Sequence, residues 1–267
     1  LGRVNPSPPL TRDDHMSTTG EHIEIRTADG VAEAYVARPD GSQDVPGVLL
    51  YMDAIGLRPQ LERIADRIAS WGYVVLVPNV FYRHGRAADL GPKVDLREPG
   101  ARQKFFPTVA PLIAGHTPEE AARDLEAYSS TLLGLPGVAR APFGVTGYCM
   151  GGRLALRAAA QMPDQVAAVG MFHTGGLVTD APDSPHLCVP RVRAEVLAGH
   201  ADKDDSMPPS AIKALDAEFA RAGVKATTAV YEGALHGYCM EDTSMYHEQA
   251  TERHYTELAD LFARTLR

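Results

Sequence analysis

The sequence predicts an α/β fold with a mostly parallel, doubly wound sheet, helices on both faces and an N-terminal antiparallel hairpin. From residue 21 of the 267-residue chain, short apolar segments alternate with amphipathic segments of helical length. Most of the short segments are apolar throughout, as strands buried on both faces of a parallel sheet are. The first two segments instead alternate in polarity, which indicates a half-buried hairpin before the βα units.

The hairpin and the buried strands are predicted from local composition. Residues 21–27 and 31–37 alternate polar and apolar side chains, and Asp29-Gly30 between them favours a tight turn. Parallel strands need crossover connections, and a segment long enough for one separates each later apolar run from the next. These runs predict strands at residues 47–52, 73–77, 143–146, 166–172, 192–197 and 226–231.

Periodicity and capping residues predict the helices. An apolar stripe with i, i+4, i+7, i+11 spacing begins at Leu57 and predicts a helix that ends before Gly72. Residues 117–120 (Thr-Pro-Glu-Glu) form a capping box with proline at the first helical position, which opens a helix to about residue 133. Further helices are expected at residues 152–161, 208–222 and 244–265.

The chain is expected to hold one domain, over residues 16–267. Residues 1–15 contain three prolines and no periodicity, so we expect a tail outside the fold, either vector-derived or a natural disordered arm. Residues 84–116 fit neither the strand nor the helix period and mix glycine, proline and charges. An insertion of that length is expected to be a cap or a binding loop.

Charge and cysteine content exclude several classes of protein. The net charge is −8 and no run concentrates lysine and arginine, so a nucleic-acid or anionic-membrane surface is not expected. The longest apolar runs are far shorter than the roughly 20 residues that span a bilayer. Three cysteines make no disulfide framework, which favours a cytoplasmic location. There is no sequence motif for a metal site, and none is expected.

Residues 147–152 (Gly-Tyr-Cys-Met-Gly-Gly) carry the strongest chemical signal. They join a predicted strand to a predicted helix in the Gly-x-nucleophile-x-Gly pattern of a nucleophile elbow, with Cys149 as the nucleophile. The turn is tight, so only glycine avoids clashes at the flanking positions. The helix N-terminus favours a thiolate, and the Met150 N–H would face a developing oxyanion. A buried, inert cysteine in a tight turn is the alternative interpretation.

An elbow nucleophile needs a base and an acid that orients the base. In enzymes built around such an elbow, the acid and then the histidine follow the nucleophile along the chain. The loop after strand 226–231 contains His236, which we expect to be the base. The loop after strand 192–197 offers Asp202, in a Gly-x-x-Asp arrangement, with Asp204 and Asp205 as rivals. We expect Asp202 to be the acid.

Two further segments join the elbow and the two loops. Residues 51–56 place an acidic residue at a strand end, and residues 72–83 read Gly-Tyr-Val-Val-Leu-Val-Pro-Asn-Val-Phe-Tyr-Arg. With these five segments in order, the chain from about residue 21 to its end resembles the dienelactone hydrolase family of α/β-hydrolases. The resemblance implies an α/β-hydrolase fold, no cofactor, and hydrolysis of an ester or lactone, of the carboxymethylenebutenolidase type, by thiolate attack through an acyl-enzyme.

The resemblance also implies roles for individual residues. Cys149 is the nucleophile, His236 the general base and Asp202 its orienting partner. Asp53 corresponds to a carboxylate, normally glutamate, that helps to convert the resting thiol to a thiolate, although it is one methylene shorter. The implied oxyanion hole consists of the backbone N–H groups of Met150 and Ala54.

The implied substrate contacts depart from the family at one position. Arg83 matches an arginine that pairs with a substrate carboxylate, for which a guanidinium fork is suited. The family's second such arginine is replaced by Met240, which weakens the case for the dienelactone itself more than the case for hydrolysis. Aromatic side chains are expected to line the pocket: Tyr82, Tyr148, Tyr238, Phe105 and Phe106.

Two other functions stay open at this point. A catalytically idle relative would keep the fold and bind a small molecule without reaction. A thiol redox protein would use Cys149, with Cys239 as a possible partner. For the hydrolase, the expected partner is a small-molecule ester or lactone, and the expected state is a monomer or homodimer.

Overall fold

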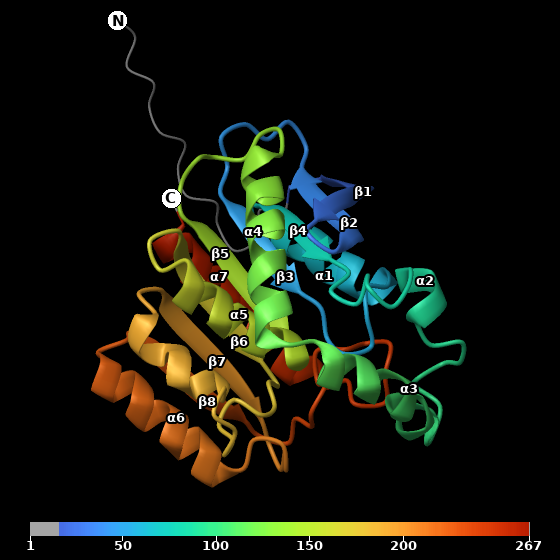
Figure 1. The fold of residues 1–267 in the computed structure, drawn as a ribbon, viewed down its shortest axis with the longest axis vertical. Coiled ribbons are helices and arrows are strands. Elements are labelled where there is room, and N and C mark those ends of the chain that lie inside the picture. The colour runs from blue at the N-terminus through green and yellow to red at the C-terminus, as the bar shows by residue number, and fades with distance from the viewer. Residues whose placement is uncertain (1–15, 267) are drawn as a thin grey trace, which may run out of the picture.

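An eight-stranded sheet forms the centre of the computed structural model, which describes residues 16–266 (Figure 1). The strand order is β1-β2-β4-β3-β5-β6-β7-β8. The first two strands pair antiparallel with each other and β2 pairs antiparallel with β4, whereas all other neighbours are parallel. The predicted α/β-hydrolase sheet with its antiparallel hairpin is therefore confirmed. The predicted tail at residues 1–15 lies outside the described residues.

The strands match the predicted runs closely, with one difference that matters for the site. The strand after residue 192 begins and ends later than predicted, because it continues through a histidine and reaches Ala201. The observed bounds are β1 (Thr18–Thr27), β2 (Gly30–Pro39), β3 (Gly47–Tyr51), β4 (Val74–Pro78), β5 (Phe143–Tyr148), β6 (Val166–Phe172), β7 (Glu195–Ala201) and β8 (Ala226–Tyr231).

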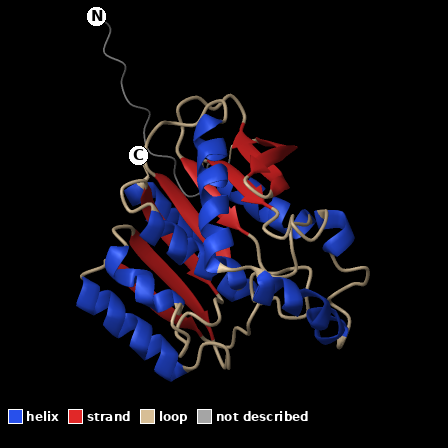
Figure 2. Ribbon diagram, in the orientation of Figure 1, coloured by secondary structure: helices blue, strands red, loops and turns tan. Residues whose placement is uncertain are grey.

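Helices cover both faces of the sheet, as Figure 2 shows. In the view of Figure 1, α4 (Pro118–Gly134), α5 (Met150–Gln161) and α6 (Pro209–Ala222) lie in front, while α1 (Pro59–Ala69) and α7 (Glu248–Thr265) lie behind. A short 3-10 helix, η1 (Pro185–Arg191), packs between α5 and α6.

The helix ends follow the predicted capping chemistry with one correction. The Thr117 side chain accepts a hydrogen bond from the Glu120 N–H, and the Glu120 carboxylate accepts one from the Thr117 N–H, so the capping box is confirmed. The last helix begins at Glu248 rather than at residue 244. The His247 side chain caps it by accepting the Ala250 N–H, and turns occupy the residues before it.

The insertion at residues 84–116 contains α2 (Ala87–Leu90) and α3 (Ala101–Gly115) and projects from the sheet at the right of Figure 1. Only two side chains of α3 are buried, those of Ala101 and Val109. The segment before α3 is tied to the body through Leu96, whose carbonyl accepts the Ser244 N–H. The insertion therefore reaches the loops at the carboxyl ends of the strands.

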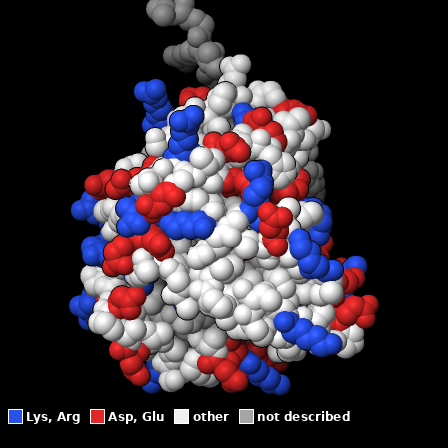
Figure 3. Space-filling model, turned by 45° about the vertical axis from the view of Figure 1, so that its right-hand side comes forward, with Lys and Arg blue, Asp and Glu red and all other residues white. Residues whose placement is uncertain are grey.

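Charged side chains of both signs are mixed over the face drawn in Figure 3, around a paler centre. No extended positive patch gathers on that face. Among the helices of residues 16–266, none combines the length and the apolar character needed to cross a bilayer.

Candidate active site

Cys149 lies at the turn that joins β5 to α5. Its backbone has φ 53° and ψ −117°, a conformation that costs a non-glycine residue about 1–3 kcal/mol. Its N–H donates to the carbonyl of Phe172 on β6, which anchors the turn to the neighbouring strand. The thiol is therefore held by the sheet in a fixed position at the helix N-terminus, as the elbow pattern predicts.

The three glycines of the elbow are required by close approach of other atoms. A Cβ at Gly147 would lie 2.2 Å from the Gly151 carbonyl oxygen, and one at Gly151 would lie 2.4 Å from the Tyr51 carbonyl oxygen. A Cβ at Gly152 would lie 1.8 Å from Thr174 Oγ1. The tight packing of α5 against β3 and β5 thus depends on the absence of side chains here.

A chain of hydrogen bonds joins Cys149 to His236 and Asp204. The Cys149 Sγ lies 3.0 Å from His236 Nε2, and His236 Nδ1 lies 2.7 Å from Asp204 Oδ2. The three residues follow β5, β8 and β7, whose carboxyl ends meet at one edge of the sheet. This is the nucleophile, base and orienting-acid geometry of covalent catalysis.

The prediction that Asp202 orients the histidine is wrong. Its carboxylate accepts the backbone N–H of Gly233, at 3.0 Å, and so fixes the loop that carries His236. Because β7 extends to residue 201, Asp202 stands at the strand end, and Lys203 follows with φ 53°. That left-handed turn brings the next residue, Asp204, to the imidazole.

Ser206 supports Asp204 and was missed by the sequence analysis. Its N–H and its hydroxyl both donate to Asp204 Oδ1, at 2.9 and 2.5 Å. The other carboxylate oxygen is left for His236. An aspartate two residues before a serine favours such a local turn, so the Asp-Asp-Ser sequence at 204–206 was the available signal. The other rival acid, Asp205, is exposed.

Electrostatics favour a thiolate and an imidazolium. Burial raises the pKa of the Cys149 thiol, but the charge of His236 and the Met150 N–H more than offset it, and the net pKa lies below its usual value. Burial lowers the pKa of His236, while the Cys149 thiolate and Asp204 raise it, to about 10 overall. Although burial opposes it, hydrogen bonding to His236 holds the pKa of Asp204 at about 2.

The two expected oxyanion donors both border Cys149. Met150 is the first residue of α5, so its N–H is one of the helix's free N-terminal donors. Ala54 follows β3 and lines a hollow of about 50 Å³ beside Cys149. Phe105 and Phe106 of α3 line the same hollow. The oxyanion role of the two N–H groups stays a prediction.

Asp53 also lines that hollow, but its carboxylate is held by Arg58. The two groups form a two-point ion pair, with Nη1–Oδ1 at 2.7 Å and Nη2–Oδ2 at 3.1 Å, and both side chains are buried. Arg58 also binds Asp242 and touches the sulfur of Met240 at 3.4 Å. The negative charge of Asp53 raises the pKa of Cys149. Its role in thiol activation therefore stays a prediction.

Arg83 does not take part in the site. Its guanidinium binds Asp124 at 2.7 Å and Asp29 at 2.6 Å, and it stacks on the ring of Tyr82 at 4.5 Å. The Tyr82 hydroxyl donates to the same Asp124. Both side chains are used in a structural ion-pair network, so the structure contradicts the substrate contacts expected for them.

Tyr148 and Tyr238 are likewise structural. Both are fully buried. The Tyr148 hydroxyl lies 2.9 Å from His254 Nε2, and the Tyr238 hydroxyl donates to the Gly199 carbonyl. Neither belongs to the walls that the described residues form around Cys149, so their predicted contact with substrate is wrong.

The main cavity at the thiol has a volume of about 610 Å³. The elbow, the loops of the hydrogen-bonded triad and helix α3 of the insertion form its walls. Two arginines that the sequence analysis did not single out, Arg102 and Arg153, line it together with Cys149 and His236. Helix α3 of the insertion therefore borders the cavity that contains the thiol, and the role of the insertion as a cap stays a prediction.

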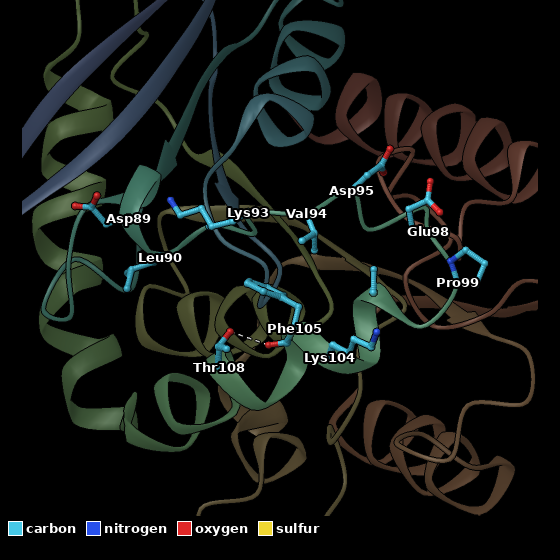
Figure 4. Close-up of a pocket in the computed structure, with 12 residues that line it drawn as sticks. Asp89, Leu90, Lys93, Val94, Asp95, Glu98, Pro99, Lys104, Phe105 and Thr108 are labelled. Carbon is cyan, nitrogen blue, oxygen red and sulfur yellow. Dashed lines mark hydrogen bonds between the residues drawn. The ribbon is translucent and has the colours of Figure 1, made fainter.

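A second cavity of about 630 Å³ lies within the insertion (Figure 4). Leu90, Val94 and Phe105 contribute apolar walls, and charged side chains surround them. Phe105 also lines the hollow beside Cys149, so its ring separates the two spaces. This cavity does not include the thiol or the imidazole, and the site is therefore placed at Cys149.

The other two cysteines are buried away from solvent. Burial raises the pKa of Cys239 well above its usual value and raises that of Cys188. A fully buried, protonated Cys239 is poorly suited to form a disulfide with Cys149, because the thiolate is the reactive form. This weakens the redox interpretation. Within residues 16–266, no three His, Cys, Asp or Glu side chains are grouped to hold a metal ion.

Comparison with known proteins decides the family. The sequence model of the Dienelactone hydrolase family matches residues 32–266. The chain belongs to the dienelactone hydrolase family. A carboxymethylenebutenolidase of Rhodococcus opacus is 27% identical over 243 residues, which cover 88% of this chain and 88% of the relative. Membership makes the chain a hydrolase of the dienelactone hydrolase type, acting on a small molecule.

Solved structures share the fold of this dienelactone hydrolase family member. The dienelactone hydrolase-like promiscuous phosphotriesterase P91, from metagenomic libraries, has a TM-score of 0.75 at 21% identity, over 94% of this chain and 100% of its own. The acylaminoacyl peptidase of Pyrococcus horikoshii has a TM-score of 0.66 at 16% identity, over 94% of this chain and 42% of its own. Both similarities support the α/β-hydrolase fold.

Proposed function

We propose that this protein hydrolyses carboxylic esters or lactones through a covalent intermediate on Cys149. The observation that carries the proposal is the Cys149–His236–Asp204 chain of hydrogen bonds at 3.0 and 2.7 Å. A binding protein has no need of an ionised thiol paired with an oriented imidazole. The chain's membership of a hydrolase family agrees with this proposal.

In the first half of the reaction the Cys149 thiolate attacks the carbonyl carbon. The carbonyl oxygen becomes an oxyanion, which the N–H groups of Met150 and Ala54 stabilise. When the intermediate collapses, the C–O bond of the ester breaks and the imidazolium of His236 gives its proton to the leaving alkoxide. In a lactone, the alcohol formed stays attached to the acyl group.

In the second half His236 is neutral and acts as a base. It takes a proton from water, and the resulting hydroxide attacks the thioester carbon. Collapse of this intermediate breaks the C–S bond, releases the acid and restores the thiolate beside the imidazolium. Asp204 keeps the imidazole in the same orientation for both steps.

The test is hydrolysis of p-nitrophenyl acetate and of a five-membered lactone. The Cys149→Ala variant is expected to lose about 1000-fold or more in kcat, because it lacks the nucleophile. Cys188→Ala is the matched control, since that thiol is buried and donates to the Leu156 carbonyl rather than to a residue of the site. Equal rates for wild type and Cys149→Ala would show that the thiolate mechanism is wrong.

A further inference from the structure

Arg153 is a cation beside the nucleophile that has no acidic partner. It lies in the first turn of α5, which begins directly after Cys149. It lines the cavity that contains Cys149 and His236. Between residues 16 and 266, no hydrogen bond or ion pair joins its guanidinium to another side chain. Burial and the neighbouring Arg157 lower its pKa, although the nearby Cys149 thiolate opposes them.

Two other arginines, one buried and one half-buried, are paired with carboxylates. Arg58 binds two carboxylates, and Arg83 binds Asp29 and Asp124. Placing a guanidinium in a cavity without a partner costs free energy, because water no longer solvates it fully. Such a group is typical of a binding site whose ligand supplies the missing charge.

Arg102 brings a second cation to the same cavity from α3 of the cap. It too lacks a hydrogen bond or ion pair to the rest of the described chain. Of the described residues that line this cavity, Asp204 alone is acidic, and its two oxygens are used by His236 and Ser206. The cavity therefore holds two guanidinium groups that no side chain among the described residues binds.

The position of Arg153 also fits an extended substrate. It lines a neighbouring groove of about 560 Å³, together with Phe106, Met150 and Gly176, which border both spaces. A group bound at Arg153 would lie in the same cavity as the carbonyl attacked by Cys149.

We propose that Arg153, assisted by Arg102, binds a carboxylate on the substrate and makes the enzyme selective for anionic esters or lactones. The proposal rests on the hydrolysis proposed above. A guanidinium fork matches a planar carboxylate and can bind both oxygens. Arg153 and Arg102 thus take the role that the resemblance implied for Arg83.

The test compares two p-nitrophenyl esters with the same leaving group. Mono-p-nitrophenyl glutarate carries a carboxylate, and p-nitrophenyl valerate has a similar length without the charge. In Arg153→Gln, kcat/KM for the glutarate is expected to fall roughly ten- to hundredfold, while that for the valerate changes about threefold or less. Arg153→Lys should recover part of the loss, since it keeps the charge but not the fork.

Arg157→Gln is the matched control on the same helix. It lies one turn further from the thiol and borders the neighbouring groove but not the cavity of Cys149, and its guanidinium already binds the Asp183 carbonyl oxygen. Its ratio of glutarate to valerate kcat/KM is expected to equal that of wild type. A fall of the same size in Arg157→Gln, or equal losses on both esters in Arg153→Gln, would overturn the proposal.

Calorimetric titration with free glutarate separates this proposal from the hydrolysis itself. Wild type is expected to bind glutarate at least about tenfold more tightly than Arg153→Gln does. If neither ester is hydrolysed but this difference in binding is found, the hydrolysis is wrong and the carboxylate site stands. If glutarate binds both proteins equally, the carboxylate site is wrong.

Discussion

Asp204 and Asp202 differ in what their side chains do, although they are two residues apart in one loop. Asp204 accepts from the imidazole of His236, whereas Asp202 accepts from the backbone N–H of Gly233. The first can control the tautomer and charge of the histidine, and the second only the path of the loop. The 2.7 Å hydrogen bond between His236 Nδ1 and Asp204 Oδ2 therefore decides which aspartate orients the histidine.

Replacing each aspartate separately distinguishes the two roles. Asp204→Asn is expected to reduce kcat on p-nitrophenyl acetate by about 100- to 10,000-fold, because the amide no longer stabilises the imidazolium. Asp202→Asn should stay within about fivefold of wild type, since its amide oxygen can still accept the Gly233 N–H. The reverse order of the two effects would show that the assignment is wrong.

The pH dependence of thiol reactivity tests the ion pair of Cys149 and His236. Because the pKa of Cys149 is lowered, wild type should react rapidly with iodoacetamide at neutral pH and slow down only as acid protonates the thiolate. In His236→Ala the imidazolium is gone but burial remains, so the midpoint should move up to about pH 8.5 or higher. Mass spectrometry of the labelled Cys149 peptide follows the rate. An unchanged midpoint would contradict the ion pair.

The strand-to-helix elbow is the element on which the site depends. Cys149 is held at φ 53° because β5, β6 and α5 fix the backbone on both sides of it. Gly151 allows α5 to approach the end of β3, where Ala54 and Asp53 follow. The close packing of these elements therefore brings the thiol and its surroundings together.

Adding a methyl group to the elbow should destabilise the whole domain. Gly151→Ala would place its Cβ against the Tyr51 carbonyl oxygen, a backbone atom that cannot easily move. We expect the free energy of unfolding to fall by about 3 kcal/mol, at the upper end for overpacked sites. Gly134→Ala is the control, because a Cβ there would meet no atom within 4 Å apart from its chain neighbours and the backbone of its own helix. Urea denaturation of both variants measures the difference, and equal stabilities would contradict the packing argument.

Local sequence predicts the elements better than it predicts the partners of charged side chains. The hairpin turn, the apolar strands, the capping box and the elbow each depend on residues close in the chain. Arg83 was assigned to the substrate by resemblance, but Asp29 and Asp124, more than 40 residues away, bind it. The choice of Asp204 depends on the left-handed turn at Lys203, which no local preference of lysine predicts.

Across the whole molecule, one buried ion-pair network joins distant parts of the chain at the site. Arg58 links Asp53, which follows β3, to Asp242 in the loop before α7. Met240 of that loop contacts the same guanidinium. The position of the Asp53 carboxylate, and with it the negative charge near Cys149, therefore depends on contacts between the first and last thirds of the sequence.

Removing Arg58 should cost more stability than removing an exposed arginine. Arg58→Ala leaves the Asp53 carboxylate buried without its partner, and the expected loss is about 3 kcal/mol in the free energy of unfolding. Arg193→Ala breaks an exposed pair with Asp164 and should cost about 1 kcal/mol or less. Chemical denaturation compares the two, and equal losses would contradict the structural role of the network.

Detection of the acyl-enzyme tests the central claim most directly. Wild type is mixed with p-nitrophenyl acetate, quenched in acid within the first turnovers, and digested for mass spectrometry. We predict an acetyl group on the peptide that contains Cys149, which disappears as hydrolysis is completed and is absent from Cys149→Ala. Continued hydrolysis without an adduct on Cys149 at any time would contradict the covalent mechanism.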